Sequence, residues 1–131
     1  MQKPIESLLF VALMVCLFIP AIGLSLPMCP GSYDPKSWTD CFGTTFLPSE
    51  VTPANTGDKY SGEWKYGRPH GRGTVMGTWA PWKYVGEWYN GKAHGQGTFT
   101  YTNGYYYVGG WRNDKQNGRG IVYHHNGSVI R

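Results

Sequence analysis

The residues of this chain best suited to chemistry are its histidines. Two of them, His70 and His94, recur in similar surroundings, and His124 and His125 are adjacent. Such residues hold zinc when further histidines, cysteines or carboxylates follow at short spacing. No such spacing occurs here, and neither a serine, histidine and acid set nor a phosphate-binding glycine loop stands out. We therefore expect no catalytic residue, metal site or cofactor, and the two recurring histidines are expected to hydrogen-bond within hairpins.

A recurring set of cations could instead bind an anionic surface. Arg68, Lys92 and Lys115 each follow a tryptophan by four residues, so we expect them in hairpin turns, aligned along one edge. Residues 59–131 hold ten basic residues against three acidic ones. Such a row could contact anionic phospholipid or acidic glycan, at about 1 kcal/mol per basic residue near a charged membrane. The alternative is that these cations keep the surface soluble and discourage edge pairing.

Aromatic residues supply a second candidate surface, since they make up 16% of the chain. Rings outside the regular core positions either form a protein or sugar interface or pack against neighbouring segments. Cations interleaved with rings also suit nucleic acid, but the export expected below argues against that partner. The candidate interface residues are Trp79, Trp82, Tyr105 and Tyr106.

The elements that must position these residues belong to a sequence unit that occurs three times. The segments YSGEWKYGRPHGRGTV, YVGEWYNGKAHGQGTF and YVGGWRNDKQNGRGIV begin at Tyr60, Tyr84 and Tyr107. Self-similarity at such a period indicates a stack of one supersecondary unit. Apolar and polar residues alternate in each segment, as in β-strands, and no 3.6-residue period is present. We expect units at residues 60–82, 84–106 and 107–129.

Each unit pairs rings with glycines. In the first unit the alternation predicts that Gly71, Gly73 and Val75 share one face of a strand. Glycine weakens a strand, but a ring lying across it fills the vacancy. We therefore predict a core of rings laid on glycines. The predicted repeat core consists of Tyr60, Gly62, Trp64, Gly71, Gly73, Tyr84, Gly86, Trp88, Gly95, Gly97, Tyr107, Gly109, Trp111, Gly118 and Gly120.

Turn residues recur between these strands. Gly67, Gly91 and Asp114 each stand three residues past a tryptophan, where a turn needs a positive φ. Asn-Gly pairs at residues 103–104 and 126–127 mark turns between units, because Asn-Gly between alternating strands is a strong hairpin signal. The predicted fold is an all-β antiparallel hairpin meander.

The first residues resemble a leader. An apolar run at residues 8–19 precedes Pro20, and the small residues Ala21 and Gly23 fit a signal-peptidase site. A cut after Ser25 is a second option, and an uncleaved anchor is the main alternative. We expect residues 1–23 to be a signal peptide and the remainder to lie outside the cytoplasm, periplasmic or extracellular, with membrane tethering if the leader stays.

Cysteine usage agrees with export. Removal of Cys16 with the leader would leave Cys29 and Cys41, an even pair in an oxidising compartment. We predict a structural disulfide, because a redox pair or metal site would need Cys-x-x-Cys spacing or nearby histidines.

A cap and linker at residues 24–57 are expected to precede the repeat domain at residues 58–131. Residues 38–46 read as a degenerate return strand, in which Cys41 and Gly43 take the places of paired glycines. Residues 47–57 are expected to form a loop or flexible link.

The pattern Tyr-x-Gly-x-Trp-x-x-Gly-x-x-His-Gly-x-Gly resembles the MORN repeat. It is complete in the first two units, while the third has Asp114 for the turn glycine and Asn117 for the histidine. The cysteine-bearing cap is similar to that of small exported bacterial MORN-repeat proteins. The resemblance implies a non-catalytic scaffold that binds a partner protein, self-associates or contacts acidic phospholipid. Protein binding or self-association is the leading expectation, and anionic lipid or glycan is the alternative.

Overall fold

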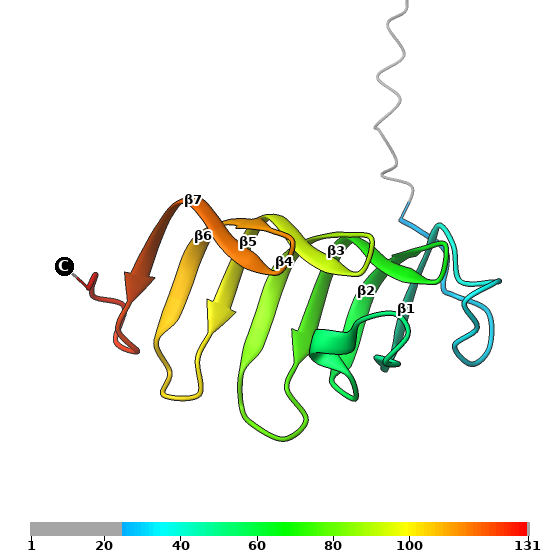
Figure 1. Cartoon of the computed structure of the whole chain (residues 1–131), viewed down its shortest axis with the longest axis horizontal. Helices are drawn as coiled ribbons and strands as arrows, with labels where there is room; N and C mark the ends of the chain where they lie inside the picture. The colour runs from blue at the N-terminus through cyan, green and yellow to red at the C-terminus, as the bar shows by residue number, and fades with distance from the viewer. Residues whose placement is uncertain (1–24, 131) are drawn as a thin grey trace, which may run out of the picture.

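One antiparallel sheet forms the framework of the described part of the chain, residues 25–130 of a computed structural model. Its seven strands follow the chain order, so each strand pairs with the next (Figure 1). This confirms the all-β meander, and the described residues contain no α-helix. The elements are β1 (Cys41–Phe46), the 3₁₀ turn η1 (Pro53–Asn55), β2 (Lys59–Lys65), β3 (Arg68–Met76), β4 (Lys83–Tyr89), β5 (Lys92–Thr100), β6 (Tyr106–Arg112) and β7 (Lys115–Tyr123).

A line of glycines crosses the sheet in register, one from each strand. Glycine therefore faces glycine at every step, and the tyrosine rings lie across these pairs. A Cβ added at Gly97 would lie 2.5 Å from the Cε2 and hydroxyl oxygen of Tyr84, so no side chain fits there. The line consists of Gly43, Gly62, Gly73, Gly86, Gly97, Gly109 and Gly120.

Tryptophans join successive units of this core. Trp88 packs edge-on against Tyr60 and Tyr84, with ring centroids 5.2 and 5.3 Å away. Its indole N–H donates to the carbonyl of Gly73 at 3.2 Å. Trp64 and Trp111 donate in the same way to glycine carbonyls of the unit before. The face that carries these rings is called the inner face below, and the opposite face is called the outer face.

The glycines of the return strands do not all point the same way. Gly71 and Gly95 adopt φ of +65° at irregularities in the strand register, and their missing side chains point toward the carboxylates of Glu63 and Glu87. Gly73 instead lies under a tyrosine. The prediction that Gly71 shares a face with Gly73 is therefore wrong, because the bulge reverses the alternation.

Two-residue turns close the three hairpins, all at the same end of the strands. Gly67, Gly91 and Asp114 have φ of 69°, 81° and 67°, and the residue before each also has positive φ. This confirms the predicted turn conformation and matches type I′ hairpins. Arg68, Lys92 and Lys115 consequently begin strands directly after the turns and do not lie within them.

The N-terminal cap continues the sheet. Cys41 pairs with Trp64 as Gly71 pairs with Trp88, which confirms the expected degenerate return strand, although it begins at Cys41 and not at residue 38. The predicted disulfide joins Cys29 to Cys41. It holds residues 27–29 beside β1, where the Cys29 N–H donates to the carbonyl of Phe42 at 2.8 Å. The otherwise free edge of the sheet is thereby partly covered.

The segment between cap and repeats is a folded loop. Leu47 is 1% exposed and belongs to the ring core. The loop is closed by hydrogen bonds from the N–H of Gly57 to Leu47 and from the N–H of Leu47 to Asp58, at 2.8 and 2.9 Å. An aliphatic anchor thus fixes residues 47–57 to the inner face, which a flexible link would not do.

The predicted leader, residues 1–23, lies outside the described residues. Within the described range no helix has the length and apolar character needed to cross a membrane. The disulfide is compatible with an oxidising location outside the cytoplasm.

Candidate functional site

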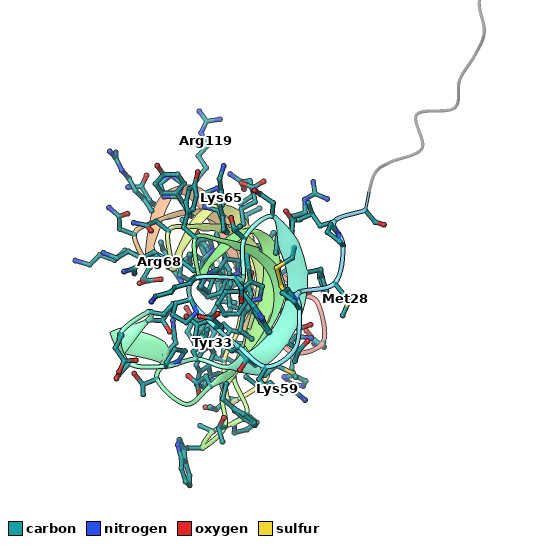
Figure 2. The ribbon with its side chains drawn as sticks, turned by 90° about the vertical axis from the view of Figure 1, so that its right-hand side faces the viewer. Met28, Tyr33, Lys59, Lys65, Arg68 and Arg119 are labelled. Carbon is teal, nitrogen blue, oxygen red and sulfur yellow. A yellow bond between two sulfur atoms is a disulfide. The ribbon has the colours of Figure 1, made fainter. Side chains whose placement is uncertain are left out.

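The inner face is covered over the first unit and open over the later ones. Residues 47–57 and Tyr33 cover it near Trp64, and Figure 2, viewed along the array, shows Tyr33 against the enclosed side chains. Beyond this loop lies an open groove of about 470 Å³. Its lining residues are Ala54, Asn55, Val75, Trp82, Tyr84, Trp88, Ala93, Phe99, Tyr101, Thr102, Trp111 and Asp114.

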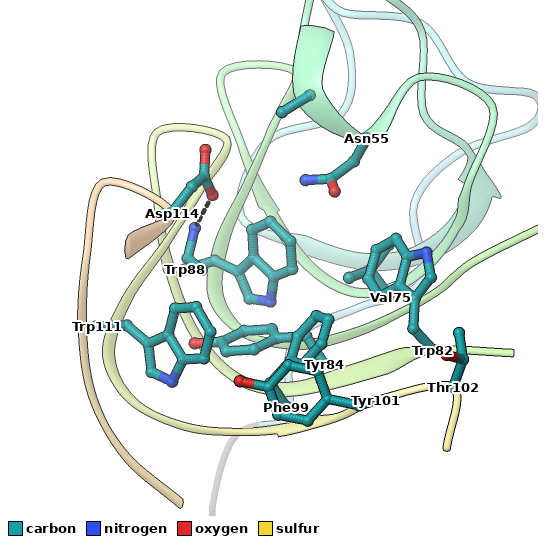
Figure 3. A pocket seen from close by; sticks show the side chains of 12 residues that line it. Asn55, Val75, Trp82, Tyr84, Trp88, Phe99, Tyr101, Thr102, Trp111 and Asp114 are labelled. Carbon is teal, nitrogen blue, oxygen red and sulfur yellow. Dashed lines mark hydrogen bonds between the residues drawn. The ribbon is translucent and has the colours of Figure 1, made fainter. Parts of the chain in front are cut away.

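Aromatic side chains make up six of the twelve residues that line the groove (Figure 3). Trp82 stacks on Phe99 with centroids 5.5 Å apart, and Tyr101 packs edge-on against Phe99 at 4.9 Å. Trp111 contacts Tyr84 at 5.1 Å. Trp82, Phe99, Tyr101 and Trp111 are half-buried, so their rings are held in place and still offer surface to a ligand.

Three polar side chains, Asn55, Thr102 and Asp114, lie around this apolar groove (Figure 3). Asp114 Oδ1 accepts the N–H of Ala93 at 2.8 Å. Asp114 is the only charged residue among the described residues that line the groove.

The buried tyrosine hydroxyls act as structural donors. The Tyr84 hydroxyl donates to the carbonyl of Glu87 at 2.9 Å, and Tyr60 donates likewise to Glu63. Burial raises the pKa of Tyr84, and the charges of Glu87 and Asp114 raise it further. Burial also raises the pKa of Tyr60. Both hydroxyls therefore stay protonated at ordinary pH.

The candidate interface residues do not form one surface. Trp82 lines the groove, whereas Trp79 is 91% exposed in the β3–β4 connection. Tyr105 packs edge-on against His124, and Tyr106 stacks on Tyr123 with centroids 4.9 Å apart. The prediction missed the groove because Tyr84, Trp88 and Trp111 occupy regular repeat positions, which the sequence pattern assigns to the core alone. The sequence feature that could have indicated the groove is Asp114, which replaces the turn glycine of the other units and lines the groove.

The candidate lipid-contact residues do lie in one row, at the hairpin ends of the strands. Arg68, Lys92 and Lys115 begin β3, β5 and β7 at the hairpin ends, and Lys65 ends β2 beside them. Figure 2 shows Lys65 and Arg68 toward this end of the strands and Lys59 at the other. Alternate strands lie about 10 Å apart, which sets the spacing of this row. Arg68 is partly committed to the fold, since its Nη1 donates to the carbonyl of Val51 at 3.3 Å.

The recurring histidines lie at the hairpins, but only His70 makes a hydrogen bond there, since the buried Nδ1 of His94 has no partner among the described residues. His70 Nδ1 accepts the N–H of Asn90 at 3.5 Å, and both His70 and His94 have rings near Tyr89. The bond to Asn90 joins neighbouring hairpins, where the prediction placed it within one. Residues 25–130 contain no group of three histidines, cysteines or carboxylates positioned to hold a metal ion.

Comparison with known proteins agrees with this architecture. The MORN repeat family model matches residues 60–79, 84–104 and 107–129. The chain therefore belongs to the MORN-repeat proteins, whose repeats generally act as non-catalytic modules that bind proteins or membranes. Among curated proteins no match to the chain is found.

Proposed function

We propose that this protein is a binding module whose open inner-face groove receives a segment of a protein partner, either another protein or a second copy. The observation that carries the proposal is the half-covered inner face. Its rings are buried by residues 47–57 near Trp64 and left accessible between Trp82 and Trp111. Ring-lined concave surfaces with few polar groups are typical ligand sites.

The covered half supports this proposal by showing what the inner face accepts. There Leu47 supplies an aliphatic anchor, and the carbonyl of Val51 accepts a hydrogen bond from Arg68. A partner segment in the open half can use the same two kinds of contact, a side chain on the rings and a backbone group at the wall. The disulfide supports placing this encounter outside the cytoplasm.

Blocking the groove should abolish partner binding without unfolding the protein. Ala54 and Thr102 are exposed residues on the groove wall, so arginine at both would obstruct it at little cost to the core. The matched control places arginines at Val85 and Val108, which are 43% and 42% exposed on the outer face. Co-purification from the source organism, identified by mass spectrometry, is expected to lose the same partner only with the groove variant. Capture of the partner that survives the two groove arginines would contradict the proposal.

A second candidate function is contact with anionic phospholipid or glycan through Arg68, Lys92 and Lys115. The observation that favours it is their alignment at the hairpin ends. In this case binding to vesicles containing anionic lipid should fall steeply with ionic strength, and charge reversal of all three residues should abolish it. A double charge reversal of Lys92 and Lys115 is compared with a control double reversal of Lys59 and Lys83, which begin β2 and β4 at the opposite end of the strands. Only the first should weaken vesicle binding. Vesicle sedimentation that is unchanged by the triple variant would remove this candidate.

A further inference from the structure

The open half of the groove combines two features that favour a positive charge. One is a set of aromatic rings, whose faces attract cations. The other is the carboxylate of Asp114, the only charged group of the described lining. This contrasts with the chain as a whole, whose formal net charge is +4.

Asp114 is placed where the other units have no side chain. Gly67 and Gly91 occupy the same turn position and take the same positive φ. Each of the three residues also donates its N–H to the cap or hairpin before it, and Asp114 donates to the carbonyl of Ala93 at 3.0 Å. The turn therefore forms without a carboxylate, and the carboxylate is an addition to the third unit.

The geometry of Asp114 keeps part of its charge accessible. Oδ1 accepts the N–H of Ala93, which fixes the side chain on the groove wall. Oδ2 accepts no hydrogen bond from the described residues. Asp114 is half-buried, and the charge of Asp114 contributes to the raised pKa of Tyr84 at the groove floor. One carboxylate oxygen is thus left beside the rings for a ligand.

We infer that the open half of the groove selects a lysine or arginine side chain of the partner polypeptide. Its aliphatic stem would lie on Trp82, Phe99 and Trp111, and its charged end would reach Asp114. Basic side chains commonly bury their stems along apolar surface and keep the charge near a polar group. This inference rests on the proposed function and specifies which side chain the groove takes.

The test uses two small probes of equal backbone, N-acetyl-lysine methylamide and N-acetyl-norleucine methylamide, which differ in the charged group. Each is titrated into the isotope-labelled protein while the indole N–H signals are followed by NMR. The chain has six tryptophans, of which Trp82, Trp88 and Trp111 line the groove. The other three are Trp38, Trp64 and Trp79, which serve as internal controls.

Asp114→Asn is the decisive variant. Asparagine keeps the acceptor for the Ala93 N–H and tolerates positive φ, so the turn is retained while the charge is lost. We expect the lysine probe to shift the groove indoles, the norleucine probe to bind more weakly, and Asp114→Asn to weaken lysine binding about three- to tenfold. Glu50→Gln removes an exposed carboxylate outside the groove and should leave binding unchanged.

Four results would overturn the inference. Equal binding of both probes, or lysine binding unaffected by Asp114→Asn, would show an apolar groove without charge selection, and the proposed function would still stand. Shifts confined to Trp38, Trp64 or Trp79, or no shift at any indole, would show that the groove does not take a basic side chain. The proposed function fails separately, by partner binding that survives the two groove arginines.

Discussion

Replacement of Gly97 by alanine is expected to destabilise the fold by about 3 kcal/mol, the upper part of the range for overpacked cores. The added Cβ would lie 2.5 to 2.6 Å from three atoms of the Tyr84 side chain. That ring is 2% exposed and packs against Trp88 and Trp111, so it cannot move aside freely. Denaturant unfolding followed by tryptophan fluorescence would measure the loss.

Gly118→Ala is the matched control for backbone strain. Gly118 has φ of +77° and open space where a methyl group would be added, because Gly110 stands where the earlier units have Glu63 and Glu87. Its replacement should cost only the penalty of a left-handed conformation, about 1 to 2 kcal/mol. A larger loss for Gly118→Ala than for Gly97→Ala would contradict a core of rings laid on glycines.

Trp88→Ala is expected to cost about 3 to 5 kcal/mol, as for other buried tryptophans. Trp88 is 3% exposed and touches the tyrosines of two units, so its removal separates them. It also leaves the Gly73 carbonyl without its indole donor. The free energy of unfolding is again the measurement.

Trp88→Phe separates the two contributions of this side chain. Phenylalanine keeps a ring between Tyr60 and Tyr84 but lacks the indole N–H. The decrease in the free energy of unfolding should therefore come mainly from the lost hydrogen bond, about 1 to 2 kcal/mol. A Trp88→Ala variant no less stable than Trp88→Phe would show that the ring does not join the units.

The sequence predicted the sheet because each unit repeats both the ring and the glycine that receives it. The spacing of Tyr84, Gly86 and Trp88 sets one strand face, and the turn at Gly91 sets the partner strand. The reversal at Gly71 was missed because strict alternation is assumed in a strand, whereas a bulge adds a residue and turns the next side chains over.

The site was harder to predict because it depends on what covers the inner face. Residues 47–57 carry no periodic pattern, so nothing in them indicated that Leu47 packs into the ring core. Because the sequence does not show that this loop forms one wall of a groove, Trp111 is interpreted from the repeat pattern as an ordinary core residue. Trp82 was a candidate because it lies off the repeat pattern, and it is the one candidate interface residue that lines the groove.

The central claim is that the open half of the inner face is the binding surface. Its most direct test is the affinity of the captured partner, measured by calorimetry, for the protein, for the variant with arginines at Ala54 and Thr102, and for the variant with arginines at Val85 and Val108. The account predicts a loss of at least about 100-fold, near 3 kcal/mol, for the groove variant and little change for the outer-face variant. Unchanged affinity in the groove variant would contradict it.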